Sequence, residues 1–442
     1  MTTAVQTGEP PARERLAPRY ATYPTAARFR ADVGPADSDA WLAALPPGPA
    51  LAARVHVPFC RQLCAFCCCR TQHARSAAPV LAYAGALVAE IGRAARLLPA
   101  GATLVAVALA GGSPTILPAP AIRALGRALD DLAPRAPDAR FSVEIEPHGV
   151  ARDRLDALLA IGVDAAVIGL QDLDPAVQDA IGRELRLDRV AATVRRLRAA
   201  GVRHLTIEVL YGLPRQTAAS FAGTCAAAAA LAPDRVVLTG YAHVPWMAKR
   251  QSLIPELSLP AEPGRAAQFA AGAAALAAAG FARLGIDLFV RAGDPLSAAA
   301  AAGALRRDLA GWLAAPVDAA LGFGAASISR LPQGYVQNLA ETGAYVARAA
   351  AGASATARGL ALGLEDRVRG RAIEMLLAGR RIDLARLAAE FGDFARRVEP
   401  ACDAAARRFP AIATLGPDLL EIGPVPPADL REIARLFDAH EG

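Results

Sequence analysis

Five cysteines lie within ten positions of one short segment, "HVPFCRQLCAFCCCRTQH" at residues 56–73. Three of them, Cys60, Cys64 and Cys67, have the spacing C-x3-C-x2-C. Three thiolates on one tight loop suit a soft metal centre, and an iron–sulfur cubane takes one ligand on each of its four irons. The spacing therefore predicts a cluster in which one iron is left open for a small molecule.

A single zinc ion is the alternative occupant of this segment. His56 or His73 could complete such a site locally. A structural zinc site normally draws a second pair of ligands from a distant segment, and the two remaining cysteines, Cys225 and Cys402, stand alone in the sequence. The same clustering argues against a disulfide framework and favours metal ligands in a reducing compartment.

A glycine turn is the second feature that could do chemistry. The segment "LAGGSPTIL" at residues 109–117 follows an apolar run, and its glycines, Gly111 and Gly112, allow backbone to approach a ligand closely. Their amide groups would then be exposed to an anion or to an amino-acid head group. Such a turn is a weak signal alone. One β/α unit after the cysteine loop, it indicates a shared site.

The elements that must position these loops repeat along the chain. Apolar runs typical of strands alternate with alanine-rich helical runs, and each pair of strands is separated by enough residues for a crossover helix. The predicted strands are residues 54–59, 103–109, 140–146, 165–171, 204–212 and 235–242. Six β/α units in a row predict an α/β fold with a parallel sheet. Length and the lack of a Gly-rich dinucleotide turn favour a partial (β/α)6 barrel over an open doubly wound sheet.

Polar side chains gather near the ends of these strands. The alternation places Glu144 and Glu146 on one face of a strand and Glu208 on a face of another, while Gln171 lies at a strand end. Glutamates in such places are often solvated or paired with arginine. Because several strands repeat the placement, and barrel active sites are built at the C-terminal mouth, we expect a site there.

The chain is expected to divide into four segments. Residues 1–50 are rich in proline and turn formers and would form an extended N-terminal arm with little regular structure. Residues 51–290 would form the barrel, and residues 291–355 an extension that covers the site. Residues 356–442 read as a small helical or winged domain.

The charge balance carries little functional information. The 442 residues include 48 Lys and Arg against 42 Asp and Glu, a formal net charge of +6. No basic block is interleaved with aromatics, so nucleic-acid binding is disfavoured, whereas the arginines permit an acidic substrate. No apolar run suits a signal peptide or a bilayer span. We expect a cytoplasmic monomer without membrane insertion.

The cysteine loop, with Phe66 just before its third cysteine, resembles that of the radical S-adenosylmethionine superfamily. From about residue 15 to the end the chain more closely resembles the oxygen-independent coproporphyrinogen III oxidases. The matching motifs include "PRYATYPTA" (18–26), "GGSPT" (111–115), "VEIEP" (143–147), "GLQDLDPAVQDAIGRE" (169–184), "YGLPRQT" (211–217) and "PDRVVLTGYAHVP" (233–245). The arm motif and the additional Cys69 are the specific parts, since the superfamily signature carries neither.

The resemblance implies a role for particular residues. Cys60, Cys64 and Cys67 would hold a [4Fe-4S] cluster, and Cys69 and Glu144 would take part in catalysis. The positions that would contact a first S-adenosylmethionine are Arg54, Phe66, Gly111, Glu144 and Ile328. Those that would contact a second one are Gly112, Ser113, Gln171, Arg183, Glu208 and Ala242.

The resemblance also implies the reaction. A 5′-deoxyadenosyl radical made from S-adenosylmethionine would take a hydrogen from a substrate propionate, which then loses carbon dioxide and one electron. Repeating this on a second propionate would convert coproporphyrinogen III to protoporphyrinogen IX in haem biosynthesis. The partners implied are a porphyrinogen-type small molecule, an external electron donor and an external electron acceptor.

Several positions depart from the family pattern. Arg54 stands where the family has tyrosine, Glu208 where it has aspartate, Leu288 where it has histidine, and Ala110 replaces the first glycine of a triple-glycine turn. These departures keep a second enzyme hypothesis open, in which the same scaffold performs methyl transfer or porphyrin ring opening. A haem-carrying chaperone is a third hypothesis, which the arm motif and Cys69 disfavour.

Overall fold

A computed structural model describes residues 20–440. The chain forms two compact units. The larger unit is built from residues 26–363. The smaller unit combines the two ends of the chain, of which residues 20–25 and 364–440 are described.

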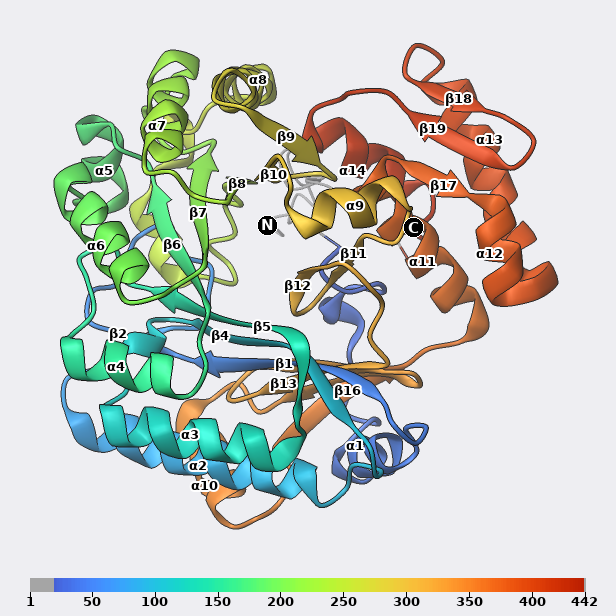
Figure 1. Ribbon diagram of the computed structural model, residues 1–442. Coiled ribbons are helices and arrows are strands. Elements are labelled where there is room, and N and C mark those ends of the chain that lie inside the picture. The colour runs from blue at the N-terminus through green and yellow to red at the C-terminus, as the bar shows by residue number, and fades with distance from the viewer. Residues whose placement is uncertain (1–19, 441–442) are drawn as a thin grey trace, which may run out of the picture. The chain divides into compact units, whose positions relative to one another are not determined.

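The larger unit is organised around a curved twelve-stranded sheet (Figure 1), in the order β16-β15-β14-β13-β1-β4-β5-β6-β7-β8-β10-β9. Its middle consists of six parallel strands in sequence order, as a partial (β/α)6 barrel requires and as the sequence predicted. These are β1 (Ala50–Val57), β4 (Thr103–Gly111), β5 (Arg135–Ile145), β6 (Ala165–Gln171), β7 (His204–Tyr211) and β8 (Arg235–Gly240).

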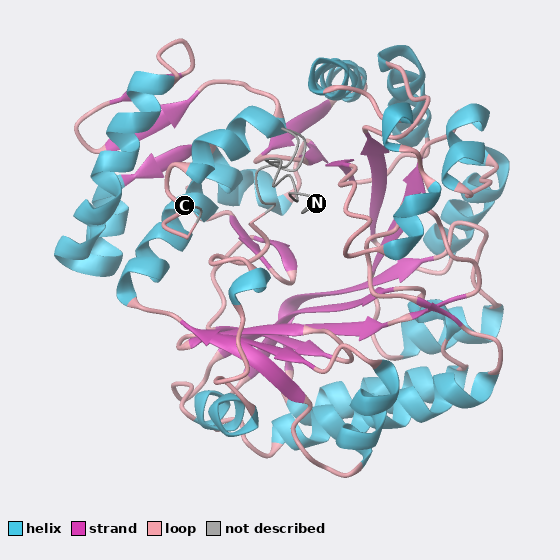
Figure 2. Ribbon diagram, turned by 180° about the vertical axis from the view of Figure 1, so that it is seen from behind, coloured by secondary structure: helices cyan, strands magenta, loops and turns pink. Residues whose placement is uncertain are grey.

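Crossover helices cover the outer face of this sheet (Figure 2). They are α2 (Ala77–Ala95), α3 (Ala119–Leu132), α4 (Arg152–Ala160), α5 (Pro175–Ile181), α6 (Leu187–Ala199), α7 (Ala218–Ala230) and α8 (Glu262–Ala278). The alternation in β7 shows why the two faces differ. Leu205, Ile207 and Val209 are buried in the large apolar core, whereas Thr206 and Glu208 point to the other face. The inner face of the sheet is therefore left for polar side chains.

Further strands extend the sheet at both edges. At the β1 edge, β13 (Ala319–Phe323) pairs with β1 in parallel, and the antiparallel strands β14 (Ile328–Leu331), β15 (Gly334–Asn338) and β16 (Thr356–Ala361) follow. At the other edge, β10 (Leu288–Arg291) pairs antiparallel with both β8 and β9 (Phe281–Leu284). Much of segment 291–355 thus continues the sheet, and its role in covering the site remains a prediction.

Shorter elements complete the larger unit. They are α1 (Pro35–Ala43), α9 (Pro295–Ala301), α10 (Thr342–Ala350), the hairpin of β11 (Arg306–Asp308) with β12 (Gly311–Leu313), and the paired segments β2 (Phe59–Cys60) and β3 (Gln72–His73). Helix α1 lies within the predicted arm, where little regular structure was expected. Pro35 begins the helix, and the Asp37 carboxylate accepts a hydrogen bond from the Gly34 amide. Residues 1–19 of the predicted arm lie outside the described residues.

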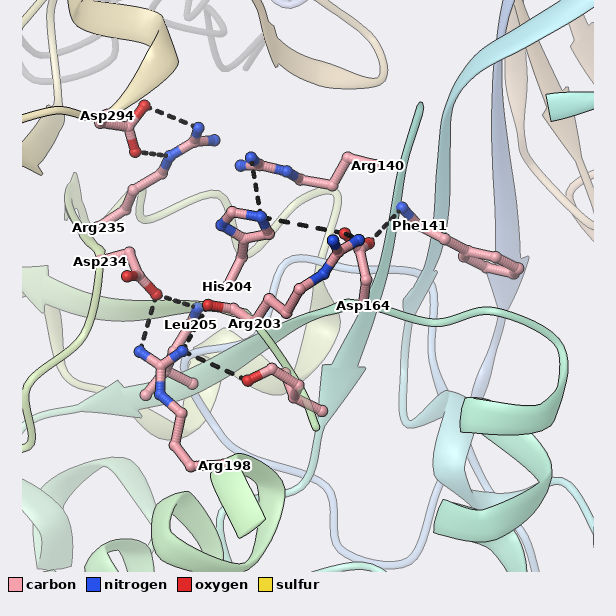
Figure 3. A network of polar contacts seen from close by, with 11 residues as sticks. Arg140, Phe141, Asp164, Arg198, Arg203, His204, Leu205, Asp234, Arg235 and Asp294 are labelled. Atoms are coloured by element: carbon pink, nitrogen blue, oxygen red, sulfur yellow. Dashed lines mark hydrogen bonds and ion pairs between the residues drawn. The ribbon is translucent and has the colours of Figure 1, made fainter. Parts of the chain in front are cut away.

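Arginine–aspartate pairs join the N-terminal ends of the barrel strands (Figure 3). Arg235, at the start of β8, binds both carboxylate oxygens of Asp294 at 2.7 and 2.9 Å. Arg140 Nη2 lies 3.4 Å from His204 Nε2. His204 Nε2 in turn lies 4.0 Å from the Asp164 carboxylate. This end of a β/α barrel carries stability. Chemistry is expected at the opposite end of the strands.

The smaller unit is mainly helical with a three-stranded sheet, in agreement with the predicted helical or winged domain. It contains α11 (Leu364–Gly379), α12 (Leu384–Phe391), α13 (Glu399–Arg408), α14 (Pro427–Arg435) and the antiparallel strands β17 (Arg381–Asp383), β19 (Leu419–Ile422) and β18 (Ala413–Leu415). The Tyr20 hydroxyl donates to Asp438 Oδ2 at 3.1 Å, and the Ala439 amide donates to the Tyr23 hydroxyl at 3.0 Å. The two chain ends are thus bound together within this unit.

Candidate active site

The cysteine loop begins where β1 ends, at the C-terminal mouth of the barrel. Pairing of β2 with β3 places Phe59 opposite Gln72 and Cys60 opposite His73, which closes the loop on itself. In its middle, the Ala65 amide donates to the carbonyl of Ile181 at 3.1 Å, at the end of helix α5. These contacts attach the loop to the barrel and hold its cysteines at the mouth.

The thiols of Cys60, Cys64 and Cys67 lie close enough to affect one another's ionisation. Burial raises the pKa of Cys60 to about 12, and the neighbouring Cys67, Glu146 and Cys64 raise it further. Burial also raises the pKa of Cys64, against the charge of Arg183. A hydrogen bond from Cys69 lowers the pKa of Cys67 to about 7. Three thiolates at such close range need a cationic centre to hold them in that form.

Arg183 joins the cysteine loop to the end of β6. Its Nη1 donates to Cys64 Sγ at 3.2 Å and its Nη2 donates to the Gly169 carbonyl at 3.1 Å. Nη2 also lies 3.5 Å from a carboxylate oxygen of Glu146. Helix α5 places this residue, since Asp174 caps its start and Gly182 ends it in a left-handed conformation just before the arginine.

The arrangement of ligands does not suit a single metal ion. Within residues 20–440, no three His, Cys, Asp or Glu side chains come close enough together to hold one ion. A zinc ion requires all its ligand atoms at about 2.0–2.3 Å from one point. An iron–sulfur cluster places each thiolate on a different iron, so it does not require the three sulfur atoms to meet around one point.

The glycine turn lies against the start of the cysteine loop. Gly111 has a φ of +117°, and a Cβ atom at Gly112 would lie 2.6 Å from the Phe59 carbonyl oxygen. The Gly112 amide donates to the Val57 carbonyl at 2.8 Å, and the Gly111 amide donates to Glu144 Oε2 at 2.8 Å. The prediction that both amides are exposed to a ligand is therefore wrong. The glycines are needed because two backbone segments approach each other here.

A group of charged side chains lies on the inner face below the mouth. The Glu144 carboxylate accepts from Gly111 and, at 3.4 Å, from Arg54 Nη2. The Glu208 side chain has no hydrogen bond or ion pair with another residue of the described chain. Burial raises the pKa of Glu208 to about 7, with the charge of Glu144 adding to the increase and Arg54 opposing it. Arg54, which stands where the family has tyrosine, thus supplies positive charge near the carboxylates of Glu144 and Glu208.

Three buried polar atoms near the cysteines lack a hydrogen-bond partner among residues 20–440, and Arg250 Nη1 beside Thr71 is one of them. Gln171 has a φ of +63°, and its Oε1 is buried without a hydrogen bond. Arg183 Nε is buried without one as well. Unsatisfied polar atoms are uncommon in folded proteins and mark places where a ligand can complete the bonding. Together with the three thiols, they fit a site for a metal cluster and a polar organic molecule.

The remaining predicted residues are placed as follows. The carbonyls of Phe66 and Ala242 both accept from Gln251 Nε2, at 2.7 and 3.0 Å. Ser113 is buried and its hydroxyl lies 3.1 Å from that of Thr115. Ile328 lies farther along the sheet in β14, opposite Gln337. Cys69 is exposed beside Cys67, as is Cys68.

Arg250 and Gln251 are parts of the site that the sequence did not indicate. Arg250 Nη2 donates to the hydroxyl and the carbonyl of Thr71 in the cysteine loop, at 2.6 and 3.2 Å. Its charge lowers the pKa of Cys60 and Cys67. Gln251 is fully buried. Both lie in a proline-rich loop without periodicity, so no sequence pattern distinguished them.

A three-cysteine loop at the mouth of a partial barrel defines the radical S-adenosylmethionine class of enzymes. Residues 55–228 match the Radical SAM superfamily. Oxygen-independent coproporphyrinogen III oxidase of Paracoccus denitrificans is 42% identical over 424 residues, covering 96% of this chain and 94% of that protein. Anaerobic coproporphyrinogen III oxidase 1 of Cereibacter sphaeroides is 41% identical over 425 residues, with the same coverage. The chain belongs to the oxygen-independent coproporphyrinogen III oxidase family.

A solved structure supports the same assignment. Coproporphyrinogen III oxidase from Escherichia coli, described as a radical SAM enzyme, matches with a TM-score of 0.88 at 29% sequence identity. The match covers 96% of this chain and 97% of that one. Between residues 20 and 440, no helix combines the length and apolarity needed to cross a bilayer.

Proposed function

We propose that this protein converts two propionate side chains of coproporphyrinogen III to vinyl groups without oxygen, giving protoporphyrinogen IX. It is an oxidoreductase of the radical S-adenosylmethionine type. The observation that carries the proposal is the C-x3-C-x2-C loop held at the barrel mouth by the glycine turn and Arg183, in a chain 42% identical to such an oxidase over 96% of its length.

Enzymes of this family use a [4Fe-4S] cluster and S-adenosylmethionine. Cys60, Cys64 and Cys67 would hold the cluster. When both groups are bound, they supply a carbon radical that can abstract a hydrogen atom from an unactivated carbon. Arg183 and Arg250 place positive charge beside the thiols, which favours their ionised form.

The inner-face residues would bind and orient the nucleoside. We assign Glu144 and Arg54 to the first S-adenosylmethionine, with Phe66, Gly111 and Ile328. The second molecule would lie against Gln171, Arg183 and Glu208, near Gly112, Ser113 and Ala242. The free Gln171 Oε1 and the unpartnered Glu208 carboxylate are acceptors and support a cationic ligand at the second position. The free Arg183 Nε could donate a hydrogen bond to an acceptor atom of the same ligand.

A second candidate function keeps the cofactors but changes the substrate, as in methyl transfer or porphyrin ring opening. The observation that favours it is the Arg54–Glu144 contact at 3.4 Å, in a place where the family has tyrosine. Leu288 adds to it, since this residue is buried opposite Val237 where the family has histidine.

One experiment separates these candidates. The cluster is reconstituted anaerobically, and dithionite, S-adenosylmethionine and coproporphyrinogen III are added. The proposal expects 5′-deoxyadenosine and protoporphyrinogen to form together. Deoxyadenosine without a porphyrin product would refute the proposal and retain the second candidate. Neither product, with stable haem binding, would point to a haem chaperone.

Cellular context is part of the proposal. We infer that the protein is a monomer in the cytoplasm, that an external donor provides its electrons, and that an external acceptor takes up the electron released by the substrate.

A further inference from the structure

Four large apolar side chains are exposed on the loop that follows β8, residues 242–258, which we term the latch loop. Trp246, Met247, Leu253 and Leu257 are 63%, 78%, 72% and 97% exposed. Within residues 20–440 only eight large apolar side chains are exposed, and half of them lie in the latch loop. Single exposed apolar residues need no explanation, but such a concentration marks an interaction surface.

The latch loop is attached to the cysteine loop by buried polar contacts. Arg250 donates to Thr71, and Gln251 donates to the carbonyl of Phe66, the residue before Cys67. Ile254 points inward into an apolar cluster that includes Ala65. A protein bound to the outer side of the latch loop would therefore lie next to the cysteines.

Positive charge without a partner lies around the same loops. The exposed side chains of Arg61, Arg70, Arg75 and Lys249 make no hydrogen bond or ion pair with another residue of the described chain. Three of them lie on or just after the cysteine loop, and Lys249 precedes the arginine that binds Thr71. At the other end of the barrel, by contrast, arginines are paired with aspartates (Figure 3). The unpaired cations are therefore available to an external anionic partner.

We propose that the latch loop and these four cations form the docking surface for a small acidic protein that carries a one-electron redox centre. The proposal rests on the proposed function, which requires an electron from outside. Tryptophan, methionine and arginine are the residues enriched at protein interfaces, and unpaired cations speed the encounter with an acidic partner. Cys60, Cys64 and Cys67 would hold the iron–sulfur group that accepts one electron, and the carrier would be oxidised by that one electron.

The sequence provides a selective test, because Lys249 is the only lysine in the chain. A carbodiimide joins a carboxylate of the partner to an amine without a spacer. We expect the reconstituted protein to form a one-to-one cross-link with an acidic flavodoxin at low salt. Lys249→Arg, which keeps the charge but loses the amine, should remove the cross-link that peptide mapping assigns to Lys249 while leaving binding intact. Cross-links that peptide mapping assigns only to the N-terminal amine or to carboxylates of this chain, and none to Lys249, would place the partner elsewhere and overturn the proposal.

Binding and turnover provide the second readout. Arg61→Glu combined with Arg70→Glu should weaken flavodoxin binding about tenfold or more and reduce flavodoxin-driven formation of 5′-deoxyadenosine in parallel. The matched control reverses two exposed arginines on helix α3, Arg123→Glu with Arg127→Glu, and should change neither. Dithionite-driven turnover should be the same in all three proteins.

The outcomes are distinguishable from failure of the proposed function. No dithionite-driven product in the unmodified protein would refute the function itself, while the cross-link would still report on docking. Equal flavodoxin binding by the Arg61→Glu/Arg70→Glu variant and the control variant would overturn the docking proposal. So would a higher KM for coproporphyrinogen III in the Arg61→Glu/Arg70→Glu variant with dithionite, which would assign the surface to substrate. Self-association through Trp246, lost in Trp246→Ser, would assign it to a second copy and overturn the proposal as well.

Discussion

Replacing Glu208 by glutamine should make the protein more stable at alkaline pH, the reverse of the usual effect of altering a site residue. Burial and the charge of Glu144 raise the pKa of Glu208 from its ordinary 4.5 to about 7. The folded protein therefore binds a proton that the unfolded chain has released between these pH values, so stability falls as the pH rises through this window. Glutamine cannot ionise and avoids that cost.

The size of the effect follows from the two pKa values. One pH unit corresponds to about 1.4 kcal/mol, so the carboxylate destabilises the fold by about 0.8 kcal/mol at pH 5 and by about 3 kcal/mol at pH 8.5. The free energy of unfolding of Glu208→Gln should exceed that of the unmodified protein by amounts of this order. Urea unfolding of the cluster-free protein at the two pH values measures the difference.

A matched variant tests whether Glu208 destabilises the fold because its carboxylate has no hydrogen-bond partner. The Glu144 carboxylate accepts hydrogen bonds from Gly111 and Arg54, so Glu144→Gln should destabilise the protein at both pH values. A Glu208→Gln protein that is less stable at pH 8.5, or that gains the same amount at pH 5, would refute the reasoning. If Glu208 is held for a cationic ligand, the stabilised variant should also bind S-adenosylmethionine more weakly.

Three further changes test the loops around the cysteines. Gly112→Ala should lower the free energy of unfolding by about 1–3 kcal/mol and reduce the amount of bound iron, because the added carbon meets the Phe59 carbonyl. The control Gly85→Ala should not destabilise the protein, because helix α2 has open space at that position. Cys64→Ala should lose the iron that the unmodified protein binds on reconstitution, measured as iron per chain, because the cluster loses one of its thiolate ligands. Cys225→Ala, at a buried cysteine of helix α7, should keep its iron. Gln251→Ala should destabilise by about 2–4 kcal/mol and open the latch loop to limited proteolysis, because buried carbonyls lose their donor; an unchanged cleavage pattern would contradict this role.

The six barrel strands could be predicted because each is a short apolar run bounded by turn residues, a pattern set by local burial. The edge strands were missed for a different reason. β13 pairs in parallel with β1 across more than two hundred and sixty residues of chain, as in the register of Leu51 with Ala319, and nothing local records that pairing. Helix α1 was missed because its nine residues lie among prolines and glycines.

The site was predicted unevenly, for a similar reason. Cysteine spacing and glycine pairs are local patterns, so the sequence could single out Cys60, Cys64, Cys67, Gly111 and Gly112 as candidates, and their roles stay predictions. The sequence could not show where the glycine amides donate, because their acceptors lie on other strands. Arg250 and Gln251 were missed because their function depends on a contact across about one hundred and eighty residues, which leaves no periodicity.

The joining of the two chain ends in the smaller unit has a consequence for biosynthesis. Tyr20 and Tyr23 emerge from the ribosome more than four hundred residues before their partners Phe437, Asp438 and Ala439. At roughly 5–20 residues per second, the first segment waits tens of seconds while the whole barrel is synthesised between the two halves of its unit. The barrel can therefore fold during translation before the second half of the smaller unit has been made. A chain truncated near its C-terminus should accordingly leave its N-terminal tyrosines open to proteases even when the barrel is folded.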